Sequence, residues 1–223
     1  MNKNFFAILV AAFVAISFVG CDRNNDDNPI DDPISNPGIG APTPTTDPGV
    51  IIGDIDGVPI RWATRNLDYP GTFAPYPHSA GRFYQWGTLN GETHHWAATG
   101  TVTGWNSSWQ RGAWTPANDP CPTGWRVPTQ AELQSLNNAG SVWTQQSGVN
   151  GRLFGTAPNQ LFLPAVGLRY TADALGGVGS WAYYWSNSAY DANFGWFLFF
   201  SSGNNNVSSS GRANGFSVRC VAE

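Results

Sequence analysis

The sequence contains few side chains whose types and spacing could support metal binding or catalysis. Glu92, His94 and His95 carry groups that bind zinc, yet adjacent side chains of a strand point to opposite faces and no further cluster has zinc-ligand spacing. Residues 176–179 lack the third glycine of a dinucleotide-binding loop, and neither a G-x-S-x-G elbow nor a phosphate-binding loop occurs. We therefore expect no metal ion or cofactor, and an exposed loop around the histidines.

Three carboxylates, Glu132, Asp173 and Asp191, could act as the acid and base of a hydrolase if the fold brings them together. Glu132 has a simpler explanation, because Thr129 and Glu132 form the S/T-x-x-E pattern of a helix capping box. The sequence therefore favours a binding protein over an enzyme, with a paired-carboxylate hydrolase as the alternative.

Residues 186–214 have the composition of a contact surface. They hold six Asn and seven Ser, four Phe, one Tyr and one Trp, but only two charged residues. Such residues are typical of antibody-like binding surfaces, because they combine rigid aromatic area with adaptable polar groups. The alternative is a strand–loop–strand with a polar turn, and the apolar run 197–200 places part of the segment in the core. The candidate ligand-binding residues are Tyr184, Asn187, Tyr190, Asp191, Asn193, Phe194, Asn204, Asn205, Asn206, Arg212 and Asn214.

The composition excludes several classes of protein. Of 223 residues only 12% are charged, and the formal net charge of −4 argues against a nucleic-acid-binding protein. An aromatic content of 14% argues against a mainly disordered chain, and the low charge argues against helical bundles. All 11 tryptophans lie between Trp62 and Trp196, among 26 Gly and 16 Pro in the whole chain. This predicts one aromatic-rich, loop-rich, largely β domain.

The N-terminus has the pattern of an export signal. Lys3 precedes an almost wholly apolar run from Phe5 to Val19, which is short for a bilayer span and normal for a secretory signal. The run ends in FVGC at 18–21, which resembles the bacterial lipobox, where the signal is cut before a cysteine that is then lipidated. We expect residues 1–20 to be a lipoprotein signal peptide, Cys21 to be lipidated, and the membrane to be reached only through this anchor. The alternative is a plain signal peptide.

A tether follows the anchor. Residues 21–49 are rich in Pro and Asp and show no helical or strand period, so they cannot bury enough apolar surface to fold. Their early acidic cluster resembles the export signals of surface lipoproteins in Bacteroidetes, or is simply a solvated linker. We expect residues 50–223 to be a domain held on this tether at the bacterial outer membrane and cell surface.

Cys121 and Cys220 remain once Cys21 is lipidated. Two cysteines in an exported domain favour one disulfide, which would close a loop of 99 residues. The alternative is two buried free thiols.

One helix is predicted among many short strands. Residues 50–67 read as a hairpin with a turn at Asp56-Gly57, and the capping box predicts a helix that begins after Thr129 and buries Leu133 and Leu136. Residues 91–120, with four tryptophans, are expected to form a long packed loop. Further strands are predicted at 82–87, 151–154, 161–170, 181–186, 195–201 and 215–221. The fold class is therefore α+β.

Six motifs in order resemble a known family. They are WATRNL at 62–67, FYQWG at 83–87, DPCPTGWRVPTQAE at 119–132, LPAVGLRY at 163–170, YWS at 184–186 and GFSVRCV at 215–221. Together they are similar to the Fibrobacter succinogenes major paralogous domain (FISUMP) of Bacteroidetes lipoproteins. The blocks at 119–132 and 215–221 also look like the sulfatase-modifying, formylglycine-generating fold. The resemblance implies a C-type-lectin-like architecture with paired N- and C-terminal strands and a loop-rich face.

The resemblance also bears on function. Formylglycine-generating enzymes hold copper with a cysteine pair, whereas Cys121 and Cys220 stand in contexts that look structural. The calcium signature of C-type lectins is missing, since Ala157-Pro158-Asn159 lacks its carboxylate. Similar domains include targets of diversity-generating retroelements. The residue types in segment 186–214 are the ones that such retroelements introduce. We expect an adhesion or ligand-binding protein whose partner is a surface protein, pilus subunit or glycan. The rivals are an enzyme of the formylglycine-generating fold and a structural fimbrial or matrix component.

Overall fold

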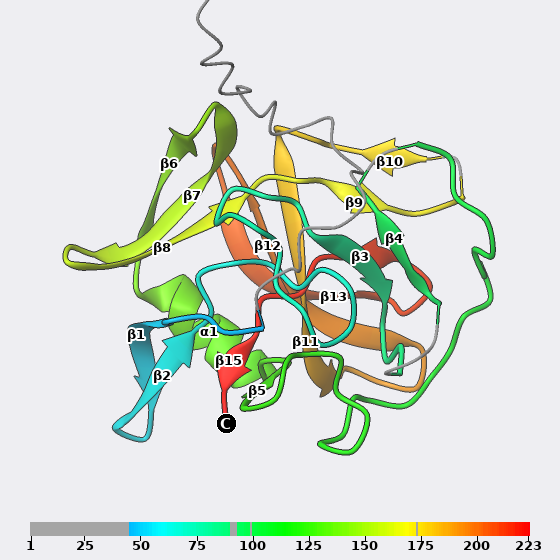
Figure 1. The fold of residues 1–223 in the computed structure, drawn as a ribbon, viewed down its shortest axis with the longest axis horizontal. Helices are drawn as coiled ribbons and strands as arrows, with labels where there is room; N and C mark the ends of the chain where they lie inside the picture. The colour runs from blue at the N-terminus through cyan, green and yellow to red at the C-terminus, as the bar shows by residue number, and fades with distance from the viewer. Residues whose placement is uncertain (1–44, 90–92, 99, 173) are drawn as a thin grey trace, which may run out of the picture. The chain divides into compact units, whose positions relative to one another are not determined.

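The computed structural model describes residues 45–89, 93–98, 100–172 and 174–223 (Figure 1). Within these residues, four sheets with mainly antiparallel pairing accompany a single helix, α1 (Gln130–Asn138), which confirms the α+β class. The expected signal peptide, the lipidation residue Cys21 and the tether as far as residue 44 lie outside the described residues.

The first sheet joins the two ends of the domain. Its strands, in order, are β1 (Val50–Ile55), β2 (Val58–Trp62), β15 (Val221–Ala222) and β5 (Trp125–Arg126). Asp56 and Gly57 both have positive φ, as the expected tight turn between β1 and β2 requires. Val221 pairs with Trp62, so the terminal strands meet as the resemblance implied.

The predicted disulfide between Cys121 and Cys220 is confirmed. Both cysteines are buried, and the bridge spans 99 residues of sequence. The residue next to Cys220 opens β15, so the disulfide fastens this last strand to the loop that precedes β5.

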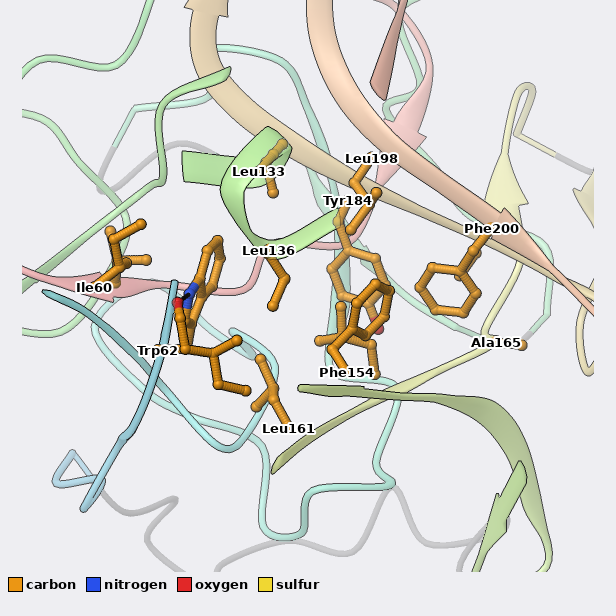
Figure 2. Packing of buried hydrophobic residues seen from close by; sticks show 14 residues of the cluster. Ile60, Trp62, Leu133, Leu136, Phe154, Leu161, Ala165, Tyr184, Leu198 and Phe200 are labelled. Carbon is orange, nitrogen blue, oxygen red and sulfur yellow. Dashed lines mark hydrogen bonds between the residues drawn. The ribbon is translucent and has the colours of Figure 1, made fainter. Parts of the chain in front are cut away.

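Helix α1 begins as the capping box predicts. Glu132 N–H donates to Thr129 Oγ1 at 3.2 Å, and Thr129 N–H donates to Glu132 Oε2 at 2.7 Å. Leu133 and Leu136, one turn apart, are buried and face the core. Figure 2 shows Leu136 pointing into the space between Trp62 of β2 and Tyr184.

Two further sheets differ from expectation in detail. One holds β6 (Ser141–Gln146), β7 (Val149–Thr156) and β8 (Asn159–Pro164), and the other holds β10 (Leu175–Gly176), β9 (Leu168–Arg169), β14 (Gly215–Phe216), β3 (Arg82–Gln85) and β4 (His95–Ala97). The single strand predicted at 161–170 is divided between β8 and β9. Gly167 has a φ of +77°, and a Cβ there would lie 2.1 Å from the Gly176 carbonyl oxygen. The chain therefore turns at a position that only glycine accepts.

The fourth sheet carries most of the candidate residues. Its strands β11 (Trp181–Ala189), β12 (Phe194–Ser201) and β13 (Asn205–Gly211) form an antiparallel meander. Tyr184 and Leu198 are paired across β11 and β12, and both belong to the hydrophobic cluster beneath α1 (Figure 2). The opposite face carries Trp185 and Phe197, which pack in a second cluster. Both faces of the sheet therefore have a buried part.

The sequence predicts that residues 45–49 belong to the tether, but Asp47 within them forms hydrogen bonds to the domain. The Asp47 carboxylate accepts hydrogen bonds from Thr64 N–H at 2.8 Å, Gly49 N–H at 2.9 Å and Arg65 Nε at 2.9 Å, and its side chain is fully buried. The sequence does not reveal these contacts, because Asp47 looks like the other acidic residues of the Pro/Asp-rich stretch.

We expect Asp47→Asn to lower the free energy of unfolding at pH 7 by about 1.5–3 kcal/mol, the usual value of hydrogen bonds to a charged group. Burial raises the pKa of Asp47, but the hydrogen bonds from Thr64, Gly49 and Arg65 outweigh it, so the pKa lies below 3.8. A carboxyl whose pKa is lowered by folding stabilises the fold above its unfolded pKa, and this stability is lost as the pH falls.

The difference between wild type and Asp47→Asn should therefore shrink below pH 3.8. Urea unfolding of the full chain at pH 7 and pH 3 measures it. Asp56→Asn, at an exposed turn position, is the matched control. Equal stabilities of Asp47→Asn and wild type at pH 7 would contradict this role.

Candidate functional site

Residues 190–194, which are the loop between β11 and β12 and the first residue of β12, are the most exposed group of candidate residues, and we name them the hairpin tip. Tyr190 is 56% exposed and Phe194 is 40% exposed, and Asp191 and Asn193 are exposed as well. The Tyr190 ring meets Trp196 edge-on at 5.1 Å between ring centroids. Two aromatic side chains and two polar side chains are thus presented together.

Local hydrogen bonds fix the shape of the hairpin tip. Asp191 Oδ1 accepts from Asn193 N–H at 2.7 Å and from Phe194 N–H at 2.9 Å, the pattern of an Asx turn. Tyr190 N–H donates to the Phe194 carbonyl at 3.0 Å. The Asp191 carboxylate is therefore engaged in holding the loop.

Arg212 lies beneath the surface, where it bonds to the backbone of the hairpin tip, and it does not face a ligand. It is only 8% exposed, which corrects its prediction as a ligand-binding residue. Its guanidinium donates to the carbonyls of Asp191 and Arg111 and lies 4.2 Å from the centroid of the Trp86 ring. Burial lowers the pKa of Arg212, and the charge of Asp191 acts in the opposite direction. The sequence did not reveal Trp86 and Arg111 as its partners, which are 126 and 101 positions away.

A β-bulge places Asn187 apart from the hairpin tip. Trp185 pairs with Phe197 and Ala189 with Gly195, so four steps along β11 match two along β12. Ser186 is buried in the bulge, where its hydroxyl donates to the Trp196 carbonyl at 3.0 Å.

Asn187 lines a cavity of about 360 Å³ with Trp114, Pro116, Asp119 and Arg126. Burial raises the pKa of Asp119, although hydrogen bonds from Val127 and Cys121 and the charge of Arg126 act in the opposite direction. The sequence alone does not indicate which residues share this cavity with Asn187, because most of them lie more than 60 positions before it and Glu223 lies beyond segment 186–214.

The candidates at Asn204, Asn205 and Asn206 lie at the other end of the sheet. Phe194 pairs with Gly211, whereas Phe200 pairs with Asn205, so six residues of β12, or about 20 Å, separate the two groups. Asn205 donates its amide to Asn137 of α1 at 2.5 Å, and Asn206 is exposed. The predicted site is therefore two separate surfaces.

Tyr184 is a core residue, which corrects its prediction as a ligand-binding residue. It is fully buried among the residues of the cluster (Figure 2), and its hydroxyl donates to the Pro164 carbonyl at 3.0 Å. Burial is the main cause that raises its pKa to about 12. Asn214 is half-buried near the base of the hairpin tip and donates to Ser210 Oγ at 2.9 Å.

The candidate acids and metal ligands have other roles where the structure describes them. Glu132 receives two hydrogen bonds from the Arg126 guanidinium, at 2.6 and 2.8 Å, in addition to its capping role. Burial raises its pKa, but the hydrogen bonds from Arg126 and Thr129 outweigh this and lower it. Glu92 and Asp173 lie outside the described residues.

The two histidines are half-buried rather than exposed, and His95 belongs to a strand. His95 begins β4 and accepts from Arg82 Nε at 2.7 Å, and the His94 ring lies 4.0 Å from that of Trp109. The described residues contain no group of three His, Cys, Asp or Glu side chains that could hold a metal ion.

Comparisons with known proteins give no relative: no family model, curated protein or solved structure matches this chain. No helix among the described residues combines the length and apolar character needed to cross a membrane.

Proposed function

We propose that this protein is a lipid-anchored, cell-surface adhesion protein that binds its partner through the hairpin tip. In this proposal the mature chain begins at Cys21, a tether links the lipid anchor to the domain, and the domain has a C-type-lectin-like, FISUMP-type architecture. The pairing of β2 with β15 supports that architecture.

The observation that carries the proposal is the exposure of Tyr190 and Phe194 on a loop of fixed shape. Large apolar rings are normally buried, and pairs of them on one exposed loop favour contact with another molecule. Asp191 and Arg212 hold the loop before a partner arrives. Binding then requires little further ordering, as in mature antibody loops.

Engagement of the acids favours binding over catalysis. Asp191 is bonded within its own turn, and Glu132 is bonded to Arg126 and to the start of α1. Each carboxylate thus has a structural role, so neither supports the paired-carboxylate hydrolase. If a retroelement diversifies the C-terminal segment, Asn193 is an exposed position where variation would alter the contact surface, whereas variation at Asp191 would also remove the hydrogen bonds that fix the loop.

Adhesion of cells that display the full chain tests this proposal. The probes are immobilised epithelial-cell membranes and immobilised bacterial outer-membrane vesicles, and antibody labelling of intact cells confirms equal display. We expect cells with the wild-type chain to adhere to at least one surface. The double variant Tyr190→Ala/Phe194→Ala should reduce that adhesion by about tenfold or more, because exposed aromatic anchors carry much of the binding free energy.

A further inference from the structure

A second surface lies on the same sheet, about 20 Å from the hairpin tip along β11. It consists of Trp181 and Tyr183 of β11, Phe199 of β12, and Asn206 and Ser208 of β13. We name it the aromatic patch. Trp181 is 46% exposed, Asn206 is exposed, and the other three are half-buried.

The register of the strands places these side chains on one face. Tyr183 pairs with Phe199, which pairs with Asn206, so a phenol, a phenyl ring and an amide form one row across three strands. Such a row is about 10 Å wide, or two interstrand spacings. Trp181 is two residues from Tyr183 on β11, and Ser208 is two residues from Asn206 on β13, so both share the face.

Contacts within the protein hold the two larger rings in place. The Tyr183 ring lies 5.2 Å from Phe199 and 4.9 Å from Phe216 between centroids. Trp181 packs on Gly177, where an added Cβ would lie 2.5 Å from the indole ring. The backbone N–H of Trp181 also donates to the Gly177 carbonyl at 2.8 Å. The aromatic patch is therefore formed before any ligand binds.

The polar atoms of the aromatic patch are available to a ligand. Within the described residues, no protein group bonds to the Trp181 indole N–H, the Tyr183 hydroxyl or the side chains of Asn206 and Ser208. The hydroxyls of Tyr183 and Ser208 are not shut off from water, and Trp181 and Asn206 are exposed residues. The patch thus offers donors and acceptors beside apolar ring surface.

The aromatic patch contains no charged side chain. Arg152 donates to the carbonyls of Ser201 and Ser202 at the end of the sheet, but it is 8% exposed and its guanidinium is used in these bonds. A charged ligand would find no counter-charge on the patch, and a purely apolar ligand would leave its hydroxyls and amide without partners.

We propose that the aromatic patch binds a neutral polysaccharide. A sugar ring has C–H groups that pack on the electron-rich face of an aromatic ring and hydroxyls that bond to amides and hydroxyls. Trp181 and Tyr183 pack on the sugar rings, and Asn206, Ser208 and the Tyr183 hydroxyl bond to their hydroxyls. This site is separate from the hairpin tip and does not depend on its function.

Affinity electrophoresis of the purified full chain tests the proposal. The gels contain mannan, xyloglucan, mixed-linkage β-glucan or soluble α-glucan as neutral probes, and heparin or polygalacturonate as charged probes. We expect at least one neutral polysaccharide, and neither charged one, to retard the protein. Trp181→Ala should weaken the retardation about tenfold or more. Tyr183→Phe keeps the ring and should weaken it about fivefold, the effect of one lost hydrogen bond.

Two controls separate this site from the hairpin tip. Tyr190→Ala/Phe194→Ala should lose cell adhesion but keep its retardation, and Tyr76→Ala, an equally exposed tyrosine, should keep both. Circular dichroism checks that each variant is folded. Retardation by no neutral polysaccharide, equal retardation of Trp181→Ala and wild type, or loss in the hairpin-tip variant would each overturn the proposal. Retention by a charged polysaccharide alone would do so too.

Discussion

Replacing Arg219 with alanine is expected to lower the free energy of unfolding by about 3–5 kcal/mol. Arg219 is 1% exposed, and its guanidinium donates to Asn66 Oδ1 at 2.6 and 3.0 Å and to the Ala63 carbonyl at 3.1 Å. The alanine variant leaves a large cavity and two buried oxygens that lose these hydrogen bonds. Both effects add to the loss.

The position of Arg219 explains why the effect is large. It connects the last segment of the chain to the loop after β2, and Asn66 in turn donates to the Ala80 carbonyl at 2.9 Å and to the Tyr184 hydroxyl at 3.3 Å. Burial lowers the pKa of Arg219 to about 10, so the side chain stays charged at neutral pH. One buried guanidinium therefore organises backbone segments from both ends of the domain.

Urea unfolding of the full chain at pH 7 measures the loss. Arg61→Ala, on the exposed side of β2, is the matched control and should change the stability by less than about 0.5 kcal/mol. A loss below about 1 kcal/mol for Arg219→Ala would show that the network contributes little.

The double variant Cys121→Ser/Cys220→Ser should lower the free energy of unfolding by about 2–4 kcal/mol. The disulfide closes a loop of 99 residues and so restricts the unfolded chain strongly. It also adjoins the hydrogen bond from Ala63 N–H to the Cys220 carbonyl at 2.9 Å, which fastens the end of the chain to the loop after β2.

Wild-type protein kept in a thiol reductant should unfold at the same urea concentration as the double variant. The reduced wild type lacks the cross-link but has no serine substitutions, so it separates the effect of losing the disulfide on stability from any effect of the serines. A double variant as stable as the oxidised wild type would show that packing alone holds the end of the chain.

Local chemistry made some of the fold predictable from sequence. The capping box at Thr129 and Glu132 and the Asp56-Gly57 turn each depend on residues a few positions apart. β13 was not predicted, because its Asn- and Ser-rich sequence is typical of a turn and becomes a strand only by pairing with the apolar β12. In β13, pairing with β12 therefore outweighs the preference of the local sequence for a turn.

The candidate site was predictable only in part for a similar reason. Composition identified the segment that contains Tyr190 and Phe194, and both are exposed. Composition does not distinguish the two faces or the two ends of the sheet, so it predicts contact roles for Tyr184 and Arg212 although both are buried. Trp181, Tyr183 and Phe199 read as strand and core residues, and only the strand register places them beside Asn206 and Ser208.

The ratio of adhesion between two variants at equal surface display tests whether the hairpin tip is the contact surface. One is Tyr190→Ala/Phe194→Ala, at the hairpin tip, and the other is Tyr76→Ala, whose ring is 49% exposed elsewhere. The hairpin-tip account predicts that the double variant adheres at least about tenfold less than Tyr76→Ala to the epithelial membranes or the vesicles. Equal adhesion of the two variants, or no adhesion of the wild type to either surface, would contradict it.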